Sequence, residues 1–367
     1  MRSVICRLAV IVSLAASAGG CGYDQVIRSW VDQSVESGAP ADVKLPGQVY
    51  LLRGLTSIYS FGIDQLAAKI SHRGVTAVVY GLTETDKLAD DIIRKYRSGE
   101  DRGPVMLLGH SSGADRAITV AQKLNEANVP VALIVGLDPT RTADAVPASV
   151  ELFINLYQGS NLIGGGAAKP AADFRGRLID VDLRQHTEIF HITLDKTTAV
   201  QDAVVEKIIA VAAFAARQAK RPPPRHPQAS AGPRPLLLKY TVPREAPIIL
   251  WDDAVRVKLK SGDTLESIAS SYDVPSWAVA QINGIEPDHP IGPGGTLIVP
   301  RIVYSDTRPP TAPPSAARGT AQAVARTSTK PPPSRDQAPA AVPEATEASP
   351  EQGAGSFGDR WTPAAAQ

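Results

Sequence analysis

The residues best suited to chemistry lie in one short stretch, Gly109-His110-Ser111-Ser112-Gly113. An apolar run precedes the stretch and a helical pattern follows it, so Ser111 is expected at a sharp turn from a strand into a helix. The flanking glycines leave room for a strained backbone that lifts the Ser111 hydroxyl clear of the sheet. The backbone N–H of Ser112, at the helix N-terminus, could help to bind a negatively charged oxygen. The spacing predicts a serine nucleophile; the alternative is an ordinary glycine-flanked turn.

A serine nucleophile needs a base to take its proton and an acid to orient that base. Two histidines follow the last predicted strand; we expect His191 to be the base because it directly precedes the final helix, and His186 is the alternative. For the acid we favour Asp138, which ends the strand after the nucleophile helix. Asp173, in a loop, is a second possibility. The next strand, ending at Tyr157, is followed by no carboxylate.

Alternating strand and helix patterns are expected to position these groups. Strands are predicted at 49–52, 76–80, 105–108, 131–137, 150–157 and 177–183, and helices at 62–73, 88–96, 112–128 and 198–217. Strands that are apolar throughout and alternate with helices indicate an α/β fold, a small doubly wound parallel sheet. Ligands bind such sheets at the carboxyl ends of the strands, where Arg53, Ser111 and Asp138 all fall.

Residues 45–217 resemble the α/β-hydrolase superfamily through the Gly109–Gly113 motif, the strand order and the placement of Asp138 and His191. The resemblance implies acyl transfer to water, with Ser111 as nucleophile and His191 as proton shuttle. It also implies an oxyanion site made by the N–H of Ser112 and a second N–H from the loop after residues 49–52, from Leu55 or Thr56. Neither a cofactor nor a metal ion is expected for this chemistry.

A second compact unit is expected at residues 256–301. Its pattern is a strand ending near Gly262, a helix capped by Asp263 or Thr264, a second helix at 276–282 and a closing strand. This unit resembles a LysM domain along its whole length, which implies a strand-helix-helix-strand fold and a glycan ligand containing N-acetylglucosamine, such as peptidoglycan. The groove would lie between two loops; the candidate residues are Gly262, Asp263, Thr264, Leu265, Asn283, Gly284 and Ile285. The alternative is a stable domain that no longer binds.

The N-terminal residues 1–20 are typical of an export signal, with Arg2 and Arg7 before a short apolar core. The run Ala18-Gly19-Gly20-Cys21 resembles a bacterial lipobox, so we expect Cys21 to be lipidated and to anchor the protein in a membrane. Cleavage after Ala18 with soluble secretion is the alternative. Cys6 lies inside the signal, so the mature chain would hold no cysteine pair.

The remaining segments are expected to be connectors. Residues 21–44 are predicted to be a tether, residues 218–255 a Pro-rich basic linker, and residues 302–367 a disordered tail rich in Pro and Ala. A net charge of +1 gives no reason to expect nucleic acid as a partner.

Together these features predict an exported serine hydrolase of the cell envelope or periplasm, acting on ester bonds and held at peptidoglycan by its LysM module. The alternative is a non-catalytic peptidoglycan-binding lipoprotein whose hydrolase-like domain is a scaffold. A glycosidase is disfavoured because no carboxylate pair is apparent at the strand ends.

Overall fold

The computed structural model describes residues 43–54, 61–81, 83–101, 103–159, 163–220 and 235–304. The predicted signal peptide, the lipidation candidate Cys21, the oxyanion candidates Leu55 and Thr56, and nearly all of the predicted tail lie outside these residues. Within them, no helix combines the length and the hydrophobicity that crossing a bilayer requires.

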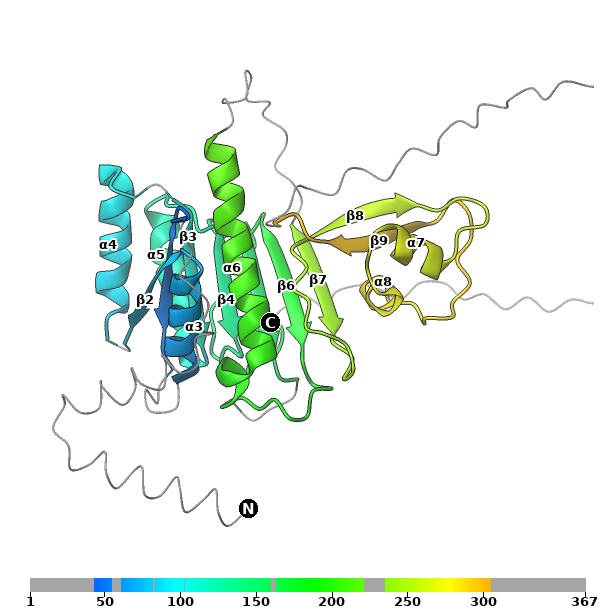
Figure 1. Ribbon diagram of the computed structural model, residues 1–367, viewed down its shortest axis with the longest axis horizontal. Coiled ribbons are helices and arrows are strands. Elements are labelled where there is room, and N and C mark those ends of the chain that lie inside the picture. Colours follow the sequence, from blue (N-terminus) through cyan, green and yellow to red (C-terminus); the bar gives the residue numbers. More distant parts are fainter. Residues whose placement is uncertain are drawn as a thin grey trace, which may run out of the picture. The chain divides into compact units, whose positions relative to one another are not determined.

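Seven parallel strands form one sheet in the order β2-β1-β3-β4-β5-β6-β7 (Figure 1). The strands are β1 Gln48–Leu52, β2 Thr76–Tyr80, β3 Val105–His110, β4 Leu133–Leu137, β5 Leu152–Tyr157, β6 Arg177–Asp182 and β7 Leu236–Thr241. Strands β3, β4 and β5 are buried at every residue, which explains why their sequences are apolar on both faces.

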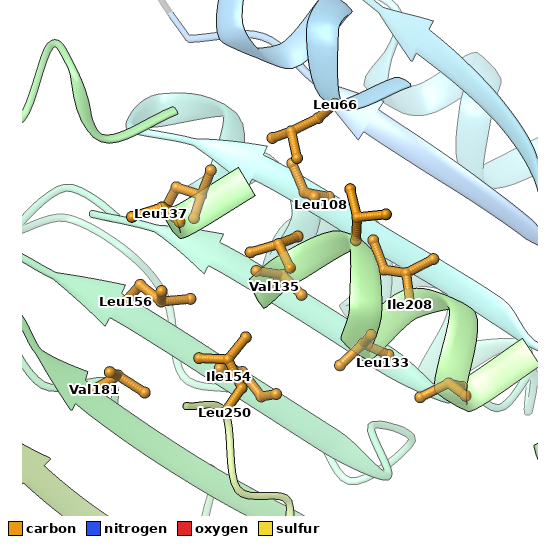
Figure 2. Close-up of a cluster of buried hydrophobic side chains, with 14 of the residues drawn as sticks. Leu66, Leu108, Leu133, Val135, Leu137, Ile154, Leu156, Val181, Ile208 and Leu250 are labelled. Atoms are coloured by element: carbon orange, nitrogen blue, oxygen red, sulfur yellow. The ribbon is translucent and has the colours of Figure 1, made fainter. Parts of the chain in front are cut away.

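Helices cover both faces of the sheet. Helices α3 (Phe61–His72) and α6 (Thr198–Ala219) contribute to one hydrophobic core, and α4 (Thr85–Ser98) and α5 (Ser112–Glu126) contribute to the other. Figure 2 shows Leu108 and Val135, from neighbouring strands, on the same side of the sheet as Ile208 of α6. This confirms the predicted α/β class.

Strand β7 corrects the prediction that residues 218–255 are a linker. Residues 236–241 pair in parallel with β6, from Arg177 opposite Leu236 to Asp182 opposite Thr241. Leu238 and Tyr240 are buried while Leu237 is 54% exposed, which is the alternation of a strand with one covered face. Prolines on both sides of this short alternation are typical of a linker, which is why the sequence alone predicts six strands and the structure has a seventh.

The C-terminal unit has the predicted strand-helix-helix-strand order. Strands β8 (Asp253–Lys258) and β9 (Thr296–Arg301) pair antiparallel, and helices α7 (Leu265–Ser271) and α8 (Ser276–Asn283) lie between them in the chain. These elements share a small hydrophobic core of their own.

Side chains of the C-terminal unit also bond to the larger sheet. The Gln281 side chain accepts a hydrogen bond from Thr241 N at 2.8 Å and donates one to Thr241 O at 3.1 Å. The Trp277 ring lies 5.7 Å from Trp251 and 6.4 Å from Tyr240, centroid to centroid. Helix α8 therefore covers part of β7, the strand at the sheet edge.

Candidate active site and LysM domain

Ser111 lies at the turn between β3 and α5 in a strained conformation, with φ 56° and ψ −129°. Its N–H continues the sheet ladder by donating to Leu137 O at 2.8 Å. The neighbouring glycines are required by space: a Cβ on Gly109 would meet the Gly113 carbonyl at 2.3 Å, and one on Gly113 would meet Leu52 O at 2.2 Å. The strand, the turn and the helix therefore hold Ser111 in the geometry expected of a nucleophile.

Asp138 directly follows β4, fully buried, also at positive φ (49°). Its N–H donates to Leu156 O at 2.7 Å, so the next strand fixes its backbone. The loop beyond Asp138 is tied to α5, because Thr140 N donates to the Asp115 carboxylate at 2.8 Å. Both the serine and the carboxylate are thus fixed at the carboxyl ends of neighbouring strands.

His191 joins these two groups from the loop between β6 and α6. Its Nδ1 lies 2.8 Å from Asp138 Oδ2, and its Nε2 lies 3.0 Å from Ser111 Oγ. An ionised Asp138 can only accept, so Nδ1 donates to it, which leaves Nε2 free to accept the serine proton. The alternatives are placed elsewhere: His186 faces Glu188 at 3.2 Å, and Asp173 is exposed.

Gln158 occupies the place after β5 where the sequence offers no acid, and its function was not predicted. Its Nε2 donates to Ile189 O at 2.8 Å and His186 O at 3.2 Å, which braces the loop that carries His191. Its position directly after β5, at a carboxyl strand end, is the sequence signal for such a role.

Of the two donors predicted for the oxyanion site, the N–H of Ser112 lies within the described residues. Ser112 is the first residue of α5, a 15-residue helix, so its N–H lies at a helix N-terminus beside Ser111. The other predicted donor, Leu55 or Thr56, falls outside the described residues.

Two further titratable side chains are buried near His191. Burial lowers the pKa of His110 to about 4, although the bond to the His191 backbone acts in the opposite direction. Burial raises the pKa of Asp195 to about 6, against the attraction of Lys196. His110 Nδ1 and Asp195 Oδ2 lie 4.0 Å apart.

The predicted glycan-binding residues divide into two groups. Leu265 is buried in the small core, Thr264 and Ser267 form a reciprocal cap on α7, and Asp263 accepts from Lys260 N at 2.7 Å. The Asn283 amide donates to Val279 O and Ile298 O and accepts from Ile298 N, each at 2.7 Å. These side chains support the fold.

The second group lies at the surface of the two loops. Gly262 and Gly284 adopt positive φ (89° and 63°), and an added Cβ at either would meet nothing within 4 Å. Ile285 is partly buried against the small core. The backbone is therefore accessible at two glycine turns, one before α7 and one after α8 in the chain.

Comparison with solved structures returns distant α/β-hydrolase-fold proteins. A thioesterase from the prodiginine pathway of Streptomyces coelicolor is 18% identical over 30% of this chain and 46% of its own, with a TM-score of 0.20. The chain thus matches about half the length of that protein. This chain is also similar to human thioesterase 2, with 12% identity over 54% of this chain and 85% of that protein and a TM-score of 0.21. A Xanthomonas campestris protein assigned to the alpha/beta hydrolase superfamily is 17% identical over 53% of this chain and 87% of its own, with a TM-score of 0.22.

Sequence comparison separates the two parts of the chain. No match was found among curated proteins. Residues 257–300 match the LysM domain family, so this part of the chain is a LysM domain, a class of module that binds peptidoglycan.

Proposed function

We propose that the protein is a cell-envelope serine hydrolase that cleaves ester bonds and is targeted to peptidoglycan by its LysM domain. One observation carries the catalytic part: a continuous chain of hydrogen bonds from Ser111 through His191 to the buried Asp138. A glycine-flanked surface serine would need neither partner. A base within hydrogen-bond reach of a hydroxyl, itself oriented by a carboxylate, is the arrangement that activates a serine.

The geometry supports a two-step acyl transfer. Ser111 Oγ attacks the ester carbonyl carbon while His191 Nε2 takes its proton, and Asp138 stabilises the resulting imidazolium. The tetrahedral intermediate collapses as His191 returns the proton to the departing alcohol oxygen, leaving an acyl-serine. Water then attacks the acyl group, with His191 again accepting a proton, and the carboxylic acid leaves as Ser111 is restored.

The negative charge on the carbonyl oxygen forms beside the N-terminus of α5. The N–H of Ser112 and the positive end of the helix are suited to stabilise that charge. We assign the second donor to Leu55, by analogy with the loop that follows the neighbouring strand in such sheets.

Targeting is assigned to the LysM domain and the N-terminal signal. Because the side chains of Asn283 and Thr264 are engaged within the fold, we assign glycan contact to the exposed backbone at Gly262 and Gly284 and to the side chain of Ile285. Export and lipidation at Cys21 would place the enzyme in the periplasm, next to its glycan.

Labelling with a fluorophosphonate tests the nucleophile. The wild type should be labelled, Ser111→Ala should not, and Ser98→Ala, at the exposed end of α4, should be labelled like the wild type. A folded wild-type protein that stays unlabelled would contradict the proposed catalytic function. It would support the alternative, a wall-binding protein with a hydrolase-like scaffold.

Sedimentation with insoluble peptidoglycan tests the targeting separately. Gly284→Asp places a charged side chain in the proposed groove at a φ that Asp tolerates, and should weaken binding. Gly166→Asp is the matched control, since Gly166 also has positive φ (75°) and open space but lies between β5 and β6, outside the LysM domain. Equal binding by both variants would contradict the proposed groove.

A further inference from the structure

His110, the residue immediately before Ser111, points into the protein and is only 5% exposed. Its Nε2 lies 2.7 Å from the backbone carbonyl oxygen of His191. Because a carbonyl oxygen can only accept, Nε2 carries the proton and donates. The strand that ends in the nucleophile is thereby bonded to the backbone of the residue that serves as its base.

The surroundings keep this ring neutral. Burial lowers the pKa of His110 to about 4, so at neutral pH the ring is an uncharged donor. On the other side of the ring, Nδ1 faces Asp195 Oδ2 at 4.0 Å, which is too long for a hydrogen bond. The two histidine rings lie close together, with centroids 5.1 Å apart.

We infer that His110 is a positioning residue, which fixes the backbone of His191 so that its imidazole stays aligned between Ser111 and Asp138. This inference rests on the proposed function. Other backbone contacts of this loop lie on either side of residue 191: Gln158 binds Ile189 O, and Thr193 N and Leu194 N donate to Phe190 O. The bond from His110 acts at residue 191 itself.

The bond gives the nucleophile and the base a second connection, independent of the hydrogen bond between their side chains. His110 is covalently joined to Ser111 and lies at the end of a strand buried at every residue. A shift of the His191 loop therefore has to break this bond. Loss of alignment of about 1 Å can slow a reaction by about 10²-fold.

The test compares two substitutions of His110. His110→Leu removes the donor but fills the space, whereas His110→Gln places an amide N–H near the position of Nε2. With p-nitrophenyl acetate, the Leu variant should lose about 10²-fold in kcat with little change in KM, because His110 does not contact substrate. Labelling by the fluorophosphonate should slow in proportion, and the Gln variant should recover most of both rates.

Asn155→Leu controls for the loss of a buried polar side chain, since the Asn155 amide bonds to Gly166 O and Asp180 rather than to the His191 loop. Thermal unfolding is measured for every variant. If His110→Leu does not fold, His110→Asn replaces it, because the shorter amide cannot reach the His191 carbonyl.

The outcomes separate this inference from the proposed function. A labelled wild type together with an equally fast, folded Leu variant would overturn the inference and leave the enzyme intact. A Gln variant as slow as the Leu variant would overturn it too, since the donor would then not be what matters. A wild type that is never labelled would overturn the proposed function, and the inference with it.

Discussion

Two of the three proposed catalytic residues, Ser111 and Asp138, have positive φ without being glycine. Such a conformation costs about 1–3 kcal/mol and persists only where the surroundings determine it. Here the ladder bonds to Leu137 O and Leu156 O fix the two backbones. The strain therefore lies at the proposed nucleophile and at its proposed acid, at the ends of adjacent strands.

Replacing the acid separates geometry from charge. Asp138→Asn keeps the shape of the side chain but presents an amide that favours the wrong tautomer of His191, so kcat should fall by roughly 10⁴-fold while the fold is retained. Ester hydrolysis and the circular-dichroism spectrum are the measurements. Asp173→Asn, at an exposed position, should leave the rate unchanged; a loss of rate there instead would assign the acid to Asp173.

The buried pair His110 and Asp195 predicts an unusual dependence of stability on pH. The ordinary pKa values are 6.5 and 3.8, so between pH 4 and 6 the unfolded chain carries one proton, on the histidine. In the folded protein the values are about 4 and about 6, so the same proton resides on Asp195. The folded and unfolded states therefore bind equal numbers of protons at these two residues. The pair does not make the free energy of unfolding depend on pH in this range. Other charges near the pair are His191, Lys196 and Asp138.

Single substitutions should reveal the two opposite slopes. In Asp195→Asn only His110 remains; the unfolded state then binds more protons, so stability should rise from pH 4 to 6 relative to wild type. In His110→Gln only Asp195 remains; the folded state binds more protons, so stability should fall over that range. Urea midpoints at pH 4.5 and 6 measure how the stability of each protein changes with pH. The same change in the wild type and in both variants would contradict the transfer of the proton from His110 to Asp195 on folding.

The sequence alone is enough to propose the residues of the site, because the chemistry of a serine nucleophile restricts the choice. Only one Ser lies in the Gly-x-Ser-x-Gly spacing, and Asp138 and His191 follow in the expected order. The contacts of Gln158 and His110 could not be predicted, because each joins strand ends to a loop through backbone carbonyls. Such bonds depend on where the loop lies relative to the strand ends in the folded protein, and the residue types alone do not give that position.

At the scale of elements, the contact between α5 and the sheet depends on Gly113. A Cβ there would meet the backbone of Leu52 and Arg53, which cannot move aside as a flexible side chain can. Gly113→Ala should therefore destabilise the protein by about 1–3 kcal/mol and slow fluorophosphonate labelling. Gly81→Ala is the control, because its Cβ would approach only the end of the Glu84 side chain, at 3.3 Å. Equal urea midpoints for the two variants would refute this close packing.

The elements that the sequence predicts well are those buried on both faces. Strands β3, β4 and β5 are short apolar runs whose positions follow from composition alone. Strand β7 is half-covered, and its protection comes from Gln281 and Trp277, about 40 residues further along the chain. Residues 236–241 show the alternation of apolar and polar side chains that is typical of a strand. They do not show which distant residues cover that strand.

At the scale of the whole molecule, a buried ion pair joins helix α6 to the residue before β8. Lys207 Nζ lies 2.5 Å from Asp252 Oδ2, and the two side chains are 4% and 0% exposed. Asp252 also accepts from Val303 N at 2.6 Å and from Tyr304 N at 3.1 Å. A single carboxylate thus holds both ends of the LysM domain, where the chain enters it and where it leaves.

Removing the cation should cost far more than a surface pair would. Lys207→Met leaves Asp252 buried without its counter-charge, so the free energy of unfolding should fall by about 3–5 kcal/mol. Lys123→Met, which breaks the exposed pair with Asp86, should change it little. Urea unfolding compares the two, and a Lys207→Met midpoint as high as that of Lys123→Met would contradict a structural role for the buried pair.

Strand β7 follows the proline-rich stretch of residues 221–234 in the chain, yet it completes a sheet whose other strands all precede that stretch. One backbone cut within residues 221–234 would therefore produce two fragments that share a single sheet. The shorter fragment would carry β7 and the LysM domain, and would stay attached through six residues of parallel pairing with β6 and through the Lys207–Asp252 pair. Proteolysis at that point would nick the chain without separating the LysM domain from the larger sheet.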